Sequence, residues 1–78
     1  MPTVRGISGP YRFFFYSFDC REPKHVHVER DQQTCKFWLE PIIVEFNKGF
    51  RRHELNTIRR LIADNLPLIH AAWEEHCG

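Results

Sequence analysis

Apolar and polar residues follow a strand-like spacing in the first half of the chain and a helical spacing in the last third. Aromatic side chains dominate Tyr11–Phe18, which favours a strand. Rings on both faces indicate a central strand or one that is partly covered on its second side. Strict alternation follows over His25–Glu29 and again over Thr34–Leu39, which is typical of half-buried strands. Ile42–Phe46 predicts a further short strand, and Asn47–Gly49 predicts a turn.

From residue 50 onward the apolar positions recur with the period of a helix. Leu55, Ile58 and Ile62 lie at positions i, i+3 and i+7, so they share one helical face. Asn65 interrupts this pattern and can cap a second helix, whose first turn tolerates Pro67. Residues 51–77 therefore form either two helices or one kinked helix.

This order of elements predicts a single α+β domain over residues 1–78, with the sheet in residues 1–47 and the helical part in residues 50–77. We expect a small antiparallel sheet of three or four strands, with two C-terminal helices packed on one face. A core of this size leaves some apolar surface exposed, which could meet a partner or a second copy in a homodimer.

The composition argues against several functional classes. Eleven basic and ten acidic residues give a net charge of +1 with the five histidines neutral, so charge alone gives no argument for a nucleic-acid binder. No apolar run approaches the roughly 20 residues that span a membrane. The N-terminus also lacks the apolar stretch of about 7–15 residues that a secretory signal requires. We therefore expect a cytoplasmic protein without a membrane partner.

The three cysteines are Cys20, Cys35 and Cys77. Their number is odd and no two have CxxC spacing, which suggests neither a disulfide framework nor a zinc knuckle. We interpret Cys35 as a small buried apolar residue and Cys77 as an exposed thiol, in agreement with a reducing compartment.

Strand alternation sorts the side chains of the central hairpin into two faces. Val26 and Val28 should face the core, which leaves His25, His27 and Glu29 on the opposite, outward face. On the next strand the inward set is Cys35, Phe37 and Leu39, and the outward set is Lys36, Trp38 and Glu40.

A hairpin with Gln32 and Gln33 at its tip would join complementary outward side chains across the two strands. A tip one residue earlier would keep the faces and change the partners. The pairs expected for the first register are Glu29 with Lys36, His27 with Trp38, and His25 with Glu40.

The outward face carries the candidate chemistry. We take His25, His27 and Glu40 as candidate catalytic residues, because a histidine pKa near ~6.5 suits proton transfer at neutral pH. Trp38 and Glu29 are candidate binding residues on this face. Two histidines at i and i+2 with a carboxylate can also ligate a metal, which leaves a metal-dependent hydrolase as a further alternative. Our leading interpretation assigns no metal site and no cofactor, and surface pairs of a small sheet are the simplest explanation.

A basic cluster follows the sheet, with a local charge of +4. Arg52 and Arg59 lie seven residues apart on one helical face and could hold phosphates of RNA or an acidic partner. A solvated helix face is the simpler explanation. An RNA-directed function gains support if these arginines lie close to the histidines. The cluster comprises Lys48, Arg51, Arg52, Arg59 and Arg60, against the single acid Glu54.

Six segments, in this order, resemble a small bacterial family catalogued as domain of unknown function 4160. They cover nearly the whole chain and are Met1–Val4, Tyr11–Ser17, Pro23–Glu29, Lys36–Pro41, Asn47–Phe50 and Ala72–Trp73. Two departures are Arg51, where Ser or Thr is usual, and Asp19–Arg21, where small or acidic residues are usual. Members are often encoded beside a second small protein, and the pair has been proposed as a type II toxin–antitoxin module.

The resemblance thus implies the toxin-like component of a prokaryotic type II toxin–antitoxin pair, inhibited by a small cognate antitoxin-like protein. If the toxicity is enzymatic, we expect RNA cleavage, with His25 or His27 as acid or base and with Arg52 and Arg59 holding phosphates. The alternative is a non-enzymatic module that docks its partner through the His/Trp sheet face. Whether the chain is an enzyme stays open at this point.

Overall fold

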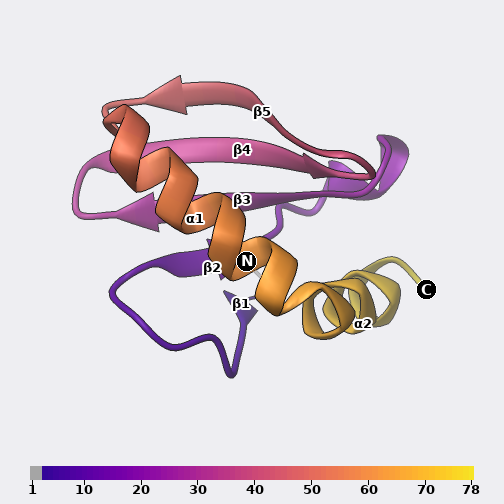
Figure 1. The fold of residues 1–78 in the computed structure, drawn as a ribbon. Coiled ribbons are helices and arrows are strands. Elements are labelled where there is room, and N and C mark those ends of the chain that lie inside the picture. The colour runs from indigo at the N-terminus through magenta and orange to yellow at the C-terminus, as the bar shows by residue number, and fades with distance from the viewer. Residues whose placement is uncertain (1–2) are drawn as a thin grey trace.

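The chain forms a five-stranded antiparallel sheet followed by two helices in a computed structural model, which describes residues 3–78 (Figure 1). The strands lie side by side in chain order, so the α+β prediction is confirmed. The sheet has one strand more than expected, because two residues near the N-terminus add a short edge strand. Met1 and Pro2, part of the first family segment, lie outside the described residues. The elements are β1 (Thr3–Val4), β2 (Arg12–Phe14), the 3₁₀ turn η1 (Asp19–Arg21), β3 (His25–Arg30), β4 (Gln33–Leu39), β5 (Ile42–Lys48), α1 (Arg52–Asp64) and α2 (Leu66–Cys77).

The aromatic segment forms a much shorter strand than its composition predicts. After Phe14 the chain turns, and the backbone N–H of Tyr16 donates to Oδ2 of Asp19 at 2.7 Å. The N–H of Asp19 in turn donates to the carbonyl oxygen of Tyr16 at 3.1 Å. These local bonds outweigh the strand preference of the rings. Phe13 and Phe15 still reach the core while Phe14 lies outside that cluster, which confirms that rings occupy both faces.

The central hairpin closes one residue earlier than the expected tip. Asp31 has a φ of 56°, in the left-handed region that aspartate tolerates, and Arg30 pairs directly with Gln33. Because this register changes each partner by two positions, the two faces stay as predicted, whereas the expected cross-strand pairs are wrong. The observed outward pairs are His25 with Trp38, His27 with Lys36 and Glu29 with Thr34, and the inward pairs are Val26 with Phe37 and Val28 with Cys35.

Both helices contribute side chains to one apolar core with the inward face of the sheet. In Figure 1, α1 runs across that face. Ile58 and Ile62 of α1 and Ile69 and Trp73 of α2 are buried against side chains that include Val26. The chain forms two helices separated at Asn65, which resolves the choice between two helices and one kinked helix. The side chain of Asn65 makes no capping bond to α2 and instead donates to the carbonyl oxygen of Leu61 at 2.8 Å. Within the described residues, no helix is long and apolar enough to cross a membrane.

The outward face is partly covered by the segment between β2 and β3. Asp19 in this segment is only 7 % exposed, and His25 is 0 % exposed. The expectation that His25 and His27 form an exposed surface was therefore wrong for His25, and His27 keeps only a partly exposed side chain. Alternation assigned the faces, but it could not show that a loop folds back over one of them.

Cys20 of η1 and Cys77 of α2 form a disulfide bond, with 5.4 Å between their Cα atoms. This corrects the expectation of no disulfide and of an exposed thiol at Cys77, because the return of α2 joins residues 57 positions apart. The argument from cysteine usage for a reducing compartment therefore falls away. Cys35 is free and buried, as predicted.

Candidate functional site

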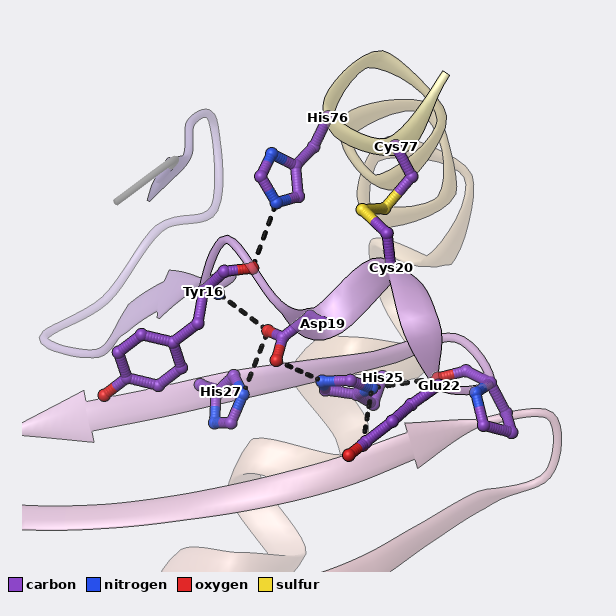
Figure 2. The surroundings of a disulfide bond; sticks show 9 residues. Tyr16, Asp19, Cys20, Glu22, His25, His27, His76 and Cys77 are labelled. Carbon is purple, nitrogen blue, oxygen red and sulfur yellow. Dashed lines mark hydrogen bonds and ion pairs between the residues drawn. A yellow bond between two sulfur atoms is a disulfide. The ribbon is translucent and has the colours of Figure 1, made fainter.

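Three polar side chains converge on the outward face of the sheet, and we call them the Asp–His cluster: Asp19, His25 and His27 (Figure 2). Residues i and i+2 of a strand project to one side, so β3 places both imidazoles together. The turn η1 directs Asp19 toward them. Nε2 of His25 lies 3.0 Å from Oδ1 of Asp19, and Nε2 of His27 lies 3.1 Å from Oδ2.

The Asp19 carboxylate is fixed by the turn that it begins. Burial acts to raise the pKa of Asp19, but the hydrogen bond from the Tyr16 N–H and the close approach of His25 and His27 outweigh it. The pKa of Asp19 therefore lies below its usual value, and the group is a carboxylate at neutral pH. The cluster thus contains a buried negative charge.

His25 is enclosed completely. Its ring centroid lies 5.5 Å from that of Trp38 on β4 and 5.2 Å from that of Trp73 on α2. Nδ1 of His25 lies 2.9 Å from the carbonyl oxygen of Pro23, and a carbonyl only accepts, so Nδ1 carries a proton and donates it. His25 is therefore a fixed group that solvent does not reach.

His27 is the member of the cluster that solvent reaches, with 14 % of its side chain exposed. Phe14 stacks on its ring with centroids 5.5 Å apart, and Tyr16 approaches it edge-on at 4.6 Å. Burial lowers the pKa of His27, and the opposing attraction of Asp19 does not restore it to its usual value. His27 is therefore neutral at pH 7, with Tyr16 beside it as the exposed rim.

Neither Nε2 atom in the cluster makes a well-aligned hydrogen bond. Both atoms are buried and have no hydrogen-bond partner among residues 3–78, although each lies close to a carboxylate oxygen of Asp19. Buried polar atoms are almost always paired in folded proteins, so this arrangement requires an explanation.

The predicted binding residues on this face take part in pairs of their own. Glu29 accepts a hydrogen bond from Arg12 at 2.6 Å, and Nε1 of Trp38 donates to Glu45 at 2.8 Å. Lys36 lies over the Trp38 ring, 4.6 Å from its centroid. Trp38 and Glu29 therefore frame the cluster without joining it.

The predicted carboxylate partner of the histidines was not the one that the structure provides. Glu40 is exposed in the β4–β5 turn, where it lines a shallow groove of about 290 Å³ with Trp38 and three other residues. Asp19 takes the place that we expected for Glu40. Sequence reasoning missed Asp19 because strand periodicity carries no information about a loop that folds back. The only available signal was an aspartate at the end of the aromatic run, shortly before the H-x-H pair.

The structure separates the basic cluster from the histidines. Arg52 and Arg59 are exposed on α1. This helix packs against the inward face of the sheet through the buried side chains of Ile58 and Ile62. The histidines project from the other face of β3. The arginines and the histidines therefore do not lie close together within one molecule, and that proximity would have supported a single RNA-directed site.

The fold and this cluster define a small α+β protein with a buried Asp–His–His set on the sheet face away from α1. The sequence model of a family described as a domain of unknown function (DUF4160) matches residues 10–74, so the chain belongs to that family. No curated protein and no solved structure matches the chain. The resemblance inferred from the sequence motifs is confirmed at the level of the family.

Proposed function

We propose that this protein is the toxin-like component of a prokaryotic type II toxin–antitoxin pair and that its activity resides at the Asp–His cluster. The toxin role comes from the association that the family resemblance implies. The observation that supports the cluster is the burial of Asp19 and His25 beside the partly exposed His27 in a small domain. Such groups cost stability unless they are well paired, and they concentrate at functional sites.

The accessibility of the three side chains suggests a division of roles. His25 is enclosed, and Asp19 is 7 % exposed, so neither meets a substrate directly. His27 is partly exposed next to Tyr16 and is the group that a substrate would touch. Asp19 and His25 are then positioning residues for the reaction.

RNA is the target that we propose for this activity. The exposed arginines of α1 support it, because Arg59 and Arg60 line one groove on that helix with Asn56. They lie on the other side of the sheet from His27, so they would hold a separate part of an RNA strand rather than the reacting phosphate. We expect Arg59→Glu to weaken binding to single-stranded RNA and to lower its salt dependence.

A growth assay tests the toxin role. Wild type, His27→Gln and the control His53→Gln, which changes an exposed histidine of α1, are induced in a bacterial host after circular dichroism has verified their folding. We expect wild type and His53→Gln to arrest growth and His27→Gln to lose that effect. Co-expression of the small protein encoded beside the gene should relieve the arrest. Normal growth of the host with wild type would rule out the toxin role.

A non-enzymatic docking module is the second candidate function, and β5 favours it. Among the described residues no strand pairs with the outer edge of β5, and Ile43 and Phe46 on this strand are 51 % and 46 % exposed. A strand of an antitoxin-like protein could add to this edge. This edge replaces the His/Trp face as the docking surface, because His25 is buried.

The two candidates give opposite results with two variants. If the protein acts as a docking module, Ile43→Lys should abolish co-purification of the adjacent small protein, while His27→Gln leaves it unchanged. Leu68→Lys, at a 40 % exposed position of α2, is the matched control. Loss of toxicity in His27→Gln with intact partner binding supports the catalytic candidate instead.

A further inference from the structure

The donor atoms of the Asp–His cluster have the spacing of ligands around one metal ion. One carboxylate oxygen and two imidazole nitrogens all lie within 4.8 Å of one another. Zinc–nitrogen and zinc–oxygen bonds of about 2.0–2.2 Å place neighbouring ligand atoms roughly 3.3–3.6 Å apart at tetrahedral angles and roughly 2.8–3.1 Å apart at right angles. Nε2 of His25 lies 3.0 Å from Oδ1 of Asp19 and Nε2 of His27 lies 3.1 Å from Oδ2, which is the spacing of ligands at right angles and slightly shorter than the tetrahedral spacing.

The direction of the donor atoms distinguishes a metal site from a simple hydrogen-bonded cluster. A hydrogen bond requires the N–H to point at the acceptor, whereas the ligands of one ion point at the ion and only pass close to each other. Nε2 of His25 and Nε2 of His27 are close to the Asp19 oxygens yet unpartnered as donors. Nitrogen and oxygen atoms that lie this close, without an N–H directed at the oxygen, have the geometry of ligands that share one ion.

The proton on His25 supports the same conclusion. Its Nδ1–H donates to the carbonyl oxygen of Pro23, which is the outer contact that metal-ligating histidines commonly make. In the neutral ring Nε2 then presents a lone pair to a carboxylate oxygen 3.0 Å away. Two such acceptors repel each other unless a cation lies between them. Among the described residues, no aligned hydrogen bond joins Nε2 of His25 to Asp19.

We propose that Asp19, His25 and His27 bind one divalent transition-metal ion, with Zn²⁺ as the ion that this ligand set fits. Two imidazoles and one carboxylate leave a fourth position of a tetrahedral ion open to a water or a substrate. A three-ligand site of this kind activates a bound water or polarises a substrate oxygen. The site goes beyond the toxin proposal and does not depend on it, because metal binding is measured without any activity.

Calorimetric titration of chelator-treated protein with Zn²⁺ tests the proposal. The Cys20–Cys77 bond is kept intact, since thiolates released by reduction would themselves bind zinc next to His76. We expect one ion per chain. The affinity should be at least about 10-fold weaker in Asp19→Asn and in His27→Gln, because the loss of a ligand weakens binding at least as much as the loss of a ligand's outer contact. The matched control His53→Gln, on α1, should bind as wild type does.

The absorption spectrum of the Co²⁺-substituted wild type reports the coordination geometry and whether a thiolate is a ligand, even if a variant fails to fold. We expect visible ligand-field bands without a thiolate-to-metal charge-transfer band, and we expect the ligand-field bands to disappear when Zn²⁺ is added. Absence of binding to the oxidised wild type would overturn the proposal. So would binding that survives both Asp19→Asn and His27→Gln, or that is lost in His76→Gln. Growth arrest without zinc binding would reject the metal site and leave the toxin role in place.

Discussion

Cys20 directly follows Asp19 in η1, and its disulfide bond to Cys77 joins this turn to the last turn of α2 (Figure 2). Nε2 of His76, in the same helical turn, lies 3.1 Å from the carbonyl oxygen of Tyr16. Two contacts therefore connect the end of α2 to the segment that holds the Asp19 carboxylate. The position of Asp19 over the histidines depends on a helix that begins 47 residues later in the chain.

Removal of the disulfide should lower the stability of the whole domain. The bond closes a loop across 57 positions, for which chain entropy predicts a loss of about 4 kcal/mol in the free energy of unfolding. We expect Cys20→Ser with Cys77→Ser to shift the urea midpoint accordingly. A reductant should destabilise wild type by a similar amount and leave the double variant unchanged. Equal stability of the oxidised wild type and the double variant would contradict the disulfide.

Cys35 should resist alkylation in the native protein. It is buried, and desolvation raises the pKa of its thiol to about 12, so the reactive thiolate is scarce at pH 8. Iodoacetamide followed by mass spectrometry should show no labelled cysteine in the folded protein and one in urea without reductant. Rapid labelling of the folded chain would contradict the burial of this thiol.

The same thiol should make stability depend on alkaline pH. The unfolded thiol ionises near pH 9, whereas the folded thiol stays protonated to about pH 12, so stability falls as pH rises through this window. The loss has an upper slope of about 1.4 kcal/mol per pH unit. Urea unfolding of wild type and Cys35→Ala at pH 8 and pH 10 isolates the effect. We expect the advantage of wild type to shrink at pH 10, and an unchanged difference would refute the assignment.

Truncation of an isoleucine should have very different effects at two positions. Ile58 is 0 % exposed in the core, so Ile58→Ala should cost about 2–5 kcal/mol through lost burial and a cavity. Ile43 on β5 is 51 % exposed, so Ile43→Ala should cost less than about 1 kcal/mol. Urea unfolding of both variants measures the contrast. Similar losses at the two positions would show that α1 does not pack as described.

The left-handed residue at the hairpin tip provides a test of the register. Glycine adopts a φ of 56° freely, so Asp31→Gly should leave stability unchanged or raise it by up to about 1 kcal/mol. Asp31→Val should lower stability by roughly 1–2 kcal/mol, because a β-branched residue is strained there. Thermal denaturation of both variants checks this. If valine proved harmless, the turn would not lie at Asp31 and Gln32.

The parts of the site that the sequence predicted correctly are those governed by short spacing. His25 and His27 lie on one side of β3, and Val26 lies on the other, because side chains alternate along any strand. Cys35 was assigned to the core for the same reason. The cross-strand partners of these residues were predicted incorrectly. A shift of the hairpin tip by one residue placed Trp38 opposite His25 without moving either side chain to another face.

The carboxylate of the cluster illustrates why the remainder could not be predicted. Glu40 and Asp19 are both acidic and both flank strands, and the sequence contains nothing that ranks one above the other as a partner of His25. The choice depends on the η1 turn folding over β3, and on the disulfide that holds this turn to α2. Both contacts join residues that belong to different segments, so the spacing of residues within one strand or helix does not predict them.

The sequence by itself therefore determined the α+β order of the main strands and the helical part, the two faces of the central hairpin and the family of the protein. Those properties follow from periodicity and motifs within a few residues of one another. The tertiary structure alone decided the strand register, the Cys20–Cys77 bond, the separation of Arg52 and Arg59 from the histidines, and the meeting of Asp19 with His25 and His27. These depend on how distant segments close upon each other, which side-chain spacing along the chain does not encode.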